Sequence, residues 1–166
     1  MADATARPFA VGPHQGDAYW YLGGLIVYKA SSEQTGGWGL SVETYPAGFA
    51  SALHVHETED SGFYVLSGRL RVRVGDEDIT AGPGGLIFLP KQVPHAFRVE
   101  GDELATWINI QGPTGDFRRL VEETGERAPS ATLPPWPTAT GTPDAESSAD
   151  ARARHRLRML GPPPFD

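Results

Sequence analysis

The sequence predicts an all-β domain, built as an antiparallel sandwich or barrel. Between residues 19 and 110 it is a succession of short apolar runs separated by glycine, proline or acidic turns, a pattern typical of antiparallel sheets. The runs with strand length and β-branched or aromatic content are LGGLIVYKA, WGLSVETY, GFYVLSG, RLRVRVG, GLIFLP, HAFRVE and LATWINI. The turns GDED, GPGG and EGDE separate several of them, and no strong helical pattern interrupts the region.

The run RLRVRVG shows the alternation most clearly. Leucine and valine at positions 70, 72 and 74 alternate with arginine at positions 69, 71 and 73, so one face of this strand is expected to be buried and the other solvated. A basic binding stripe is the functional alternative. We interpret the arginines as an exposed face, because rows of charge usually solvate a sheet.

Composition excludes several classes of protein. The 166 residues, 39% of them hydrophobic, can bury the core of one ordinary domain without a metal ion or disulfide bonds to stabilise it. The absence of cysteine excludes disulfides, a thiolate zinc site and a cysteine nucleophile. A net charge of −7 argues against nucleic acid or an anionic membrane as partner. Without a signal peptide or an apolar span in the sequence, we expect a soluble cytoplasmic protein.

The sequence predicts two parts. Residues 1–112 are expected to form a barrel with an N-terminal arm, and residues 113–166 a C-terminal part that packs on the barrel. PTGDFRRLVEETGE predicts a helix with Thr114 as N-cap and Gly125 as its end. A proline-rich segment follows, with Leu133 and Trp136 as apolar anchors. The segment AESSADARARHRLRML predicts a second helix that ends at Gly161, its arginines placed where the helix dipole favours cations.

Three histidines form the strongest chemical signal. His54 and His56 are two residues apart, so on a strand both imidazoles lie on the same face. His95 follows a proline at the start of another strand. Three neutral imidazoles converging in a barrel would form a facial metal site with open positions. An HxH pair alone is weak evidence, since two histidines on a strand can simply face solvent.

The spacing of these histidines and their flanking glycines resembles the two motifs of the cupin superfamily. The matching positions are Gly48, His54, His56 and Gly68 for the first motif, and Gly84, Pro90 and His95 for the second. The resemblance implies a jelly-roll barrel over roughly residues 20–110. The opening AYWYLGGLIVYKASSEQTGG and the terminal LGPPP further resemble small single-domain cupins of the quercetin 2,3-dioxygenase-like type. The resemblance implies that the histidines at positions 54, 56 and 95 are metal ligands.

One position departs from the family pattern. Where the motif has a glutamate that is a metal ligand and, in flavonol dioxygenases, the base, this chain has Ser61. Without that carboxylate the ion should bind less tightly but be a stronger Lewis acid. Glu57, Glu59 and Asp60 are expected to be solvated at the barrel rim; the alternative is a bulge that turns Glu59 or Asp60 inward.

Strand parity predicts the residues of the cavity. If Ser61 faces inward, so do Phe63 and Val65, and Phe97 does so on the strand of His95. Aromatic residues of strands whose register is unknown complete the candidates: Trp38, Trp107, Tyr45 and Tyr28. Tyr28 or Glu43 could act as acid or base, with Tyr28 and Ser61 as the catalytic candidates. The alternative for the aromatic residues is that they fill the core.

Three functions are compatible with these residues. The first is a metal-dependent oxygenase for an aromatic or polyketide-like small molecule, with iron or nickel as cofactor and manganese, zinc or copper as alternatives. The second is a non-oxidative cyclase or isomerase, and the third a non-catalytic ligand-binding module; Ser61 could leave the site without metal. We expect a homodimer, as in many cupins, with residues 8–11 as a pairing arm.

Overall fold

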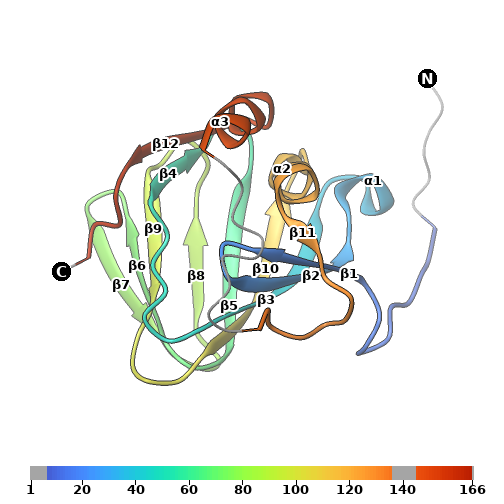
Figure 1. Ribbon diagram of the computed structural model, residues 1–166, viewed down its shortest axis with the longest axis horizontal. Coiled ribbons are helices and arrows are strands. Elements are labelled where there is room, and N and C mark those ends of the chain that lie inside the picture. Colours follow the sequence, from blue (N-terminus) through green and yellow to red (C-terminus); the bar gives the residue numbers. More distant parts are fainter. Residues whose placement is uncertain (1–6, 136–144, 166) are drawn as a thin grey trace.

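Two antiparallel sheets face each other and form a barrel in the computed structural model, which describes residues 7–135 and 145–165 (Figure 1). The larger sheet has the order β11 (Glu126–Arg127), β1 (Asp17–Tyr21), β2 (Gly24–Ala30), β3 (Gly39–Tyr45), β10 (Ala105–Gly112), β5 (Asp60–Ser67) and β8 (Leu86–Leu89). The smaller sheet has the order β12 (Leu157–Gly161), β4 (Leu53–His56), β9 (His95–Val99), β6 (Leu70–Val74) and β7 (Glu77–Ala81). The predicted all-β class is confirmed.

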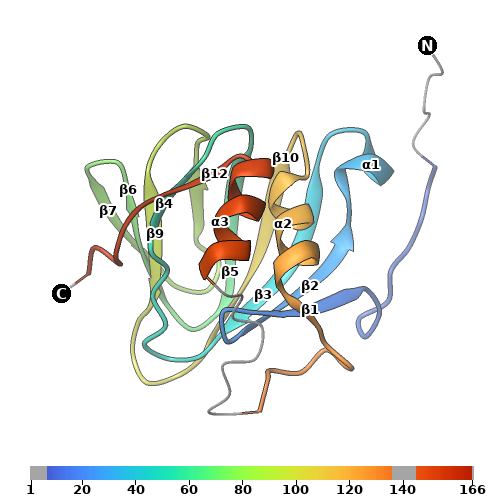
Figure 2. The same cartoon turned by 45° about the horizontal axis from the view of Figure 1, so that its top comes forward.

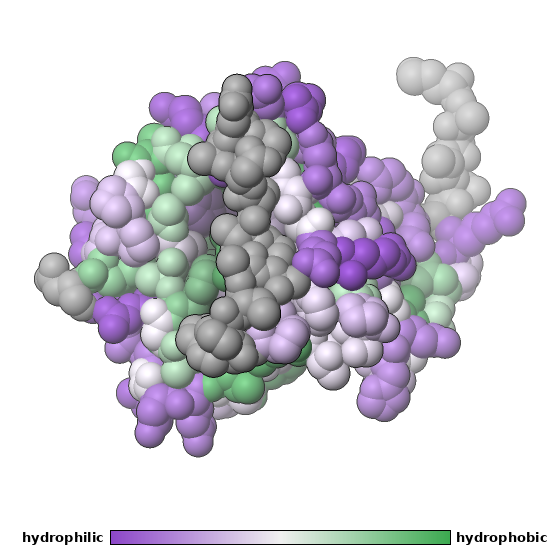
Figure 3. Space-filling view, in the orientation of Figure 1, coloured by the Kyte–Doolittle hydropathy of each residue, from purple (hydrophilic) through white to green (hydrophobic). Residues whose placement is uncertain are grey.

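The core lies between the sheets and follows from the alternation of the strands. Leu70, Val72 and Val74 of β6 are buried, as expected, and the arginines between them point outward. Arg71 and Arg73 pair there with Asp78 of β7, at 2.8 and 3.4 Å. This pairing supports the interpretation of the arginines as a solvated face. Hydrophilic residues also form much of the outer margin of the molecule in Figure 3.

Gly68 carries the chain from the larger sheet to the smaller one. It lies in the turn between β5 and β6 with a φ of 73°, in the left-handed region that disfavours side chains. A Cβ at this position would lie 2.5 Å from the carbonyl oxygen of Leu104 and 2.6 Å from the Cα of Ala105. Glycine is therefore required twice at this position, by the dihedral angle and by the close approach of β10.

The C-terminal part contributes a strand to each sheet, which the sequence did not predict. Helix α2 (Asp116–Thr124) packs on the barrel through the fully buried Leu120 and Val121, and ends at Gly125 as predicted. Leu133 packs against the barrel, also as predicted, whereas Trp136 lies outside the described residues. None of the described helices is long and apolar enough to span a membrane.

The second C-terminal helix is shorter than predicted. Helix α3 (Ala145–Arg154) ends at Arg154, and the next residues form β12, which pairs with β4. The prediction of a helix up to Gly161 was wrong, because Leu157 and Met159 alternate with arginines and can pair with the free edge of β4. Helices α2 and α3 lie side by side over the end of the barrel, and β12 runs away from them along β4 (Figure 2).

A short helix in the barrel region was also missed. Helix α1 (Ser32–Thr35) interrupts the strands and begins with a capping box, in which Ser31 and Gln34 bind each other's backbone N–H groups. The sequence signal was present, because Ser-x-x-Gln is the pattern of such a box. The helix is only one turn long, which is why no apolar period indicated it.

Helix α2 is capped by a carboxylate from outside the helix. The predicted N-cap, Thr114, was wrong: the N-cap residue is Gly115, which has no side chain to cap the helix. Glu59, from the loop between β4 and β5, accepts hydrogen bonds from the N–H groups of Gly115 and Phe117, the latter at 2.8 Å. Glu59 is 2% exposed, so the expectation that it is solvated was wrong. The helix N-terminus attracts the carboxylate and satisfies its oxygens.

Replacing Glu59 by glutamine should lower the free energy of unfolding by about 1–2 kcal/mol, because an amide has one acceptor oxygen and would leave one of the two N–H groups without its partner. Urea denaturation measures this loss. Glu57→Gln is the matched control, since Glu57 makes only a half-exposed ion pair with Arg158 at 3.7 Å and should change stability little. Equal losses in the two variants would contradict the capping role.

Candidate metal centre and cavity

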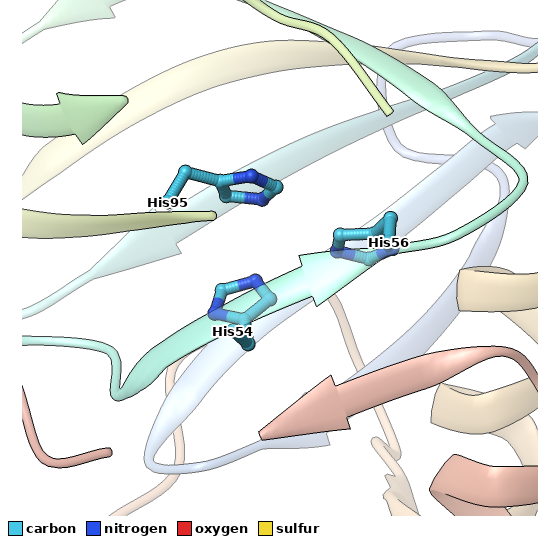
Figure 4. Close-up of side chains that lie close together, drawn as sticks. All are labelled: His54, His56 and His95. Carbon is cyan, nitrogen blue, oxygen red and sulfur yellow. The ribbon is translucent and has the colours of Figure 1, made fainter. Parts of the chain in front are cut away.

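The three histidines lie together on two adjacent strands of the smaller sheet. His54 and His56 project from β4 and His95 from β9, and the pairing of these strands places His54 opposite His95. Figure 4 shows the three rings turned toward a common space. One ring nitrogen of each lies within 4.8 Å of those of the other two. The convergence that the spacing predicted is therefore present.

Backbone carbonyl groups fix two of the imidazoles. Nδ1 of His54 lies 2.8 Å from the carbonyl oxygen of Ala52, and Nδ1 of His95 lies 3.0 Å from that of Val93. A carbonyl oxygen can only accept a hydrogen bond, so Nδ1 carries the hydrogen in each ring. Nε2 then keeps its lone pair, which is the state needed for metal binding. His56 is held by its ring contact with Phe117 of α2, at 5.4 Å between centroids.

Burial keeps these imidazoles neutral. It lowers the pKa of His95 to about 3 and that of His54 below its usual value, and it lowers the pKa of His56 well below the usual value, with added repulsion from the other two rings. Near neutral pH the cluster therefore holds uncharged donors and no proton has to leave before a metal binds. Three neutral, converging nitrogens fit a divalent transition metal, the group that the resemblance implies.

The structure places no carboxylate beside the histidines within the described residues. Ser61 of β5 is 3% exposed, lines the same cavity and accepts a hydrogen bond from Nε2 of Gln111 at 3.3 Å. Of the neighbouring acids, Glu59 caps α2, Asp60 accepts the N–H of Lys91 at 2.8 Å, and Glu57 is half-buried at the rim. The alternative, a bulge that turns Glu59 or Asp60 toward the histidines, is therefore not present.

A cavity of about 460 Å³ opens in front of the histidines. Six aromatic side chains of tyrosine and phenylalanine line it: Tyr21, Tyr45, Phe49, Phe63, Phe97 and Phe117. Phe63 and Phe97 line it as predicted. Val65 and Trp107, in contrast, are completely buried in the core behind this wall, Trp107 at 5.6 Å from the ring of Phe63. The alternative that aromatic residues fill the core therefore holds for Trp107.

Two predicted residues lie outside this cavity. Trp38 is 47% exposed, because β3 begins only at Gly39 and Trp38 belongs to the preceding loop. Tyr28 is buried in a separate cluster with Tyr19 and Tyr21, beneath the guanidinium group of Arg118. Its hydroxyl has no partner among the described residues, and burial raises its pKa well above the usual value. The expected placement of both residues at the pocket was wrong.

Glu43 is the one carboxylate among the described residues that line the cavity. It is 3% exposed on β3, and its Oε1 accepts hydrogen bonds from Oγ of Ser41 at 3.0 Å and from Nδ2 of Asn109 at 2.8 Å. Burial raises the pKa of Glu43 to about 7, although both hydrogen bonds lower it. The sequence indicated Glu43 as a possible acid or base, but it showed no residue that would bind the carboxyl group. Its parity with the inward-facing Tyr45 is the signal that could have placed it.

A cation lies at the wall of the cavity, and no sequence pattern predicted its position there. Arg152 of α3 lines the cavity together with Leu157, Met159 and Pro163 of the C-terminal segment. Its charge lowers the pKa of Tyr21, which burial nevertheless raises to about 12. Alternate arginines scatter around a helix, so their spacing could not show that one of them faces the barrel.

Fold and site together define a small β-barrel protein with three convergent histidines whose arrangement fits a metal ion. The family model of the cupin domain matches residues 41–111, which include all three histidines. Over these residues the chain is similar to cupin domains.

Solved structures agree with this fold. KdgF from Halomonas sp. is 19% identical, with a TM-score of 0.59 over 68% of this chain and 99% of that one. A predicted oxalate decarboxylase from Thermotoga maritima is 18% identical, with a TM-score of 0.55 over 63% of this chain and 99% of that one. No curated protein sequence shows significant similarity to the chain. At these identities the likeness shows the fold alone.

Replacing Glu43 by glutamine should stabilise the protein at high pH only. A folded-state pKa of about 7 against a usual 4.5 means that the charged form opposes folding, with a penalty that grows as pH rises from 4.5 to 7 and is constant above. The variant should therefore gain up to about 3 kcal/mol at about pH 8 and little at about pH 4.

Urea denaturation at both pH values measures the difference. Glu77→Gln, on the exposed strand β7, is the control and should show no such pH dependence. If Glu43→Gln gave the same change in stability at both pH values, Glu43 would have an ordinary pKa in the folded protein.

Proposed function

We propose that the protein is a metal-dependent oxygenase that acts on an aromatic or polyketide-like small molecule. The observation that carries the proposal is the convergence of three neutral imidazoles on an aromatic-walled cavity of about 460 Å³. His54, His56 and His95 would hold the ion. A bound divalent transition metal, iron or nickel first, would supply Lewis acidity and a site at which a substrate oxygen and dioxygen meet.

The residues of the chain divide the remaining tasks. Phe49, Phe63 and Phe97 offer flat apolar surfaces that would orient an aromatic ring and exclude water from it. Ser61 and Gln111 offer neutral polar groups beside the histidines. Since no carboxylate joins the histidines, the site would keep the full charge of the ion and favour an anionic substrate oxygen.

The position of Arg152 also supports an acidic substrate. It is the one arginine or lysine among the described residues that line the cavity, and the wall around it is formed by apolar side chains of β12 and the following loop. In a site with little water a guanidinium group attracts an anion strongly. A phenolate, enolate or carboxylate on a ring system would match this arrangement.

Metal binding is the first test of the proposal. Protein loaded with Fe(II), Ni(II) or Zn(II) should unfold at a higher temperature than metal-free protein, because the ion binds the folded state. His95→Ala should lose the bound metal and this shift, since two imidazoles remain. His14→Ala, an exposed histidine before β1, should retain both. Elemental analysis and thermal melts measure the two effects.

Oxygen uptake with a flavonol such as quercetin tests the activity. The iron- or nickel-loaded protein should consume oxygen only with the substrate and with all three histidines present. A protein that takes up no metal under any of these conditions would overturn the proposal.

A non-oxidative cyclase or isomerase is the second candidate, and Glu43 favours it. A buried carboxyl with a pKa of about 7 is suited to proton transfer near neutral pH, which such reactions require. The two candidates differ in their need for oxygen. Turnover of a substrate that continues unchanged under nitrogen supports the second and contradicts the first.

Ser61→Glu should raise metal affinity by an order of magnitude or more, because it adds a carboxylate ligand to three neutral donors. The metal-free variant should be less stable than the parent, since the new carboxylate is buried without a partner. Added metal should more than restore that stability. Ser61→Gln is the matched control of similar size. Equal affinities in the two variants would place position 61 out of reach of the ion.

A further inference from the structure

We propose that Glu43 and Asn109 form a proton-accepting site for a hydroxyl group of the substrate, on the sheet opposite the histidines. Glu43 accepts the proton, and Asn109 binds the same hydroxylated substrate. The proposal deepens the proposed function, because it assigns the base that Ser61 does not supply and names the substrate class, a phenol or an enol. It does not require that oxygen is used.

The hydrogen bonds of Glu43 leave one of its oxygens for a ligand. Both donors, Ser41 and Asn109, reach the same atom, Oε1. Oε2 accepts no hydrogen bond from the described residues, and the side chain lines the large cavity. Two hydrogen bonds on one oxygen fix the orientation of the carboxyl group. Oε2 is therefore held ready for a donor that enters the cavity.

Asn109 supplies a second, independent indication. Its side chain is 2% exposed, and because Nδ2 donates to Glu43, its Oδ1 is the acceptor that remains. That oxygen is buried and has no hydrogen-bond partner in the described part of the chain. A buried acceptor without a partner destabilises the folded protein. The residue lines the cavity, so a hydroxyl of a bound molecule would satisfy it.

Among the described residues, Glu43 has no counter-ion with which its ionised carboxylate could form a stabilising pair. Neither an arginine nor a lysine of the described ranges affects its pKa. The groups around it are Tyr45 on its own strand, Tyr28 on β2 and Tyr21 on β1, and burial raises the pKa of each, so all three are neutral at neutral pH. Elsewhere on the cavity wall lie the three neutral imidazoles and the cation of Arg152. A carboxyl buried without a counter-ion destabilises the fold, which indicates a function.

The proton transfer balances without any further reactant. The O–H bond of the substrate breaks, its electron pair stays on oxygen, and the proton forms a new O–H bond at Oε2 of Glu43. The products are a phenolate or enolate and a neutral carboxylic acid. When product leaves, Glu43 returns the proton to it or to water. The anion so formed is the species that an ion held by the three histidines would bind.

A proton inventory tests the proposal with 4-nitrocatechol as probe. Calorimetry in two buffers of different ionisation enthalpy gives the number of protons released to solvent when the probe binds the zinc-loaded protein. At about pH 8, where Glu43 is largely ionised, the wild-type protein should release one proton fewer than Glu43→Gln. At about pH 5 Glu43 is already protonated and the difference should vanish.

Controls separate this role from a structural one. Glu77→Gln should release as many protons as the wild type, and Asn109→Ala should bind the probe at least tenfold more weakly, because the orphaned acceptor is removed. Infrared difference spectra of the wild-type protein should show a new protonated carboxyl on binding, which Glu43→Gln lacks. The wild-type spectrum tests the proton transfer even if a variant fails to fold.

The outcomes also distinguish the two proposals. If zinc does not bind, the metal centre fails, whereas the same inventory on metal-free protein still tests Glu43. Equal proton release by wild type and Glu43→Gln at about pH 8 would overturn the role of Glu43 even if zinc binds. Failure of 4-nitrocatechol to bind either form would overturn it as well, since the proposed site takes hydroxylated aromatic molecules.

Discussion

The pairing of β4 with β9 is the constraint on which the site depends. A single register, with His54 opposite His95, brings the third imidazole from a part of the chain about forty residues away to the pair on β4. A shift by one residue would turn His54 and His56 to the other face of the sheet and separate both from His95. Strand β12 pairs with β4 on one side and β6 pairs with β9 on the other, so both strands are held inside the smaller sheet.

The sequence indicated the parts of the fold that depend on local pattern. Alternation predicted β6 and its buried face, and the spacing of histidines and glycines predicted the convergence of three imidazoles. It could not show which loop residues turn inward, because that depends on partners distant in the chain. Glu59 is buried only because the N-terminus of α2 lies above it, and β12 is a strand only because the edge of β4 is free.

The same distinction explains the cavity. Phe63 and Phe97 could be placed by parity, since each shares a strand with a residue whose direction the motif suggests. Trp38 could not be, because the start of β3 was not known to a single residue. Glu43 had no detectable partner in the sequence, as Asn109 is 66 residues away and only the pairing of β3 with β10 joins them. Strand register, and not residue type, separates the correct placements from the wrong ones.

Burial acts on the two ends of the cavity in opposite ways, and this difference gives the site its chemistry. It lowers the pKa of the imidazoles and raises that of Glu43, so both kinds of group are driven toward their uncharged forms. Neutral imidazoles are donors for a cation. A carboxyl with a pKa of about 7 can take a proton from a substrate and release it again near neutral pH. In the proposed function, serine at position 61 would thus separate metal binding from proton transfer, with the histidines on one sheet and Glu43 on the other.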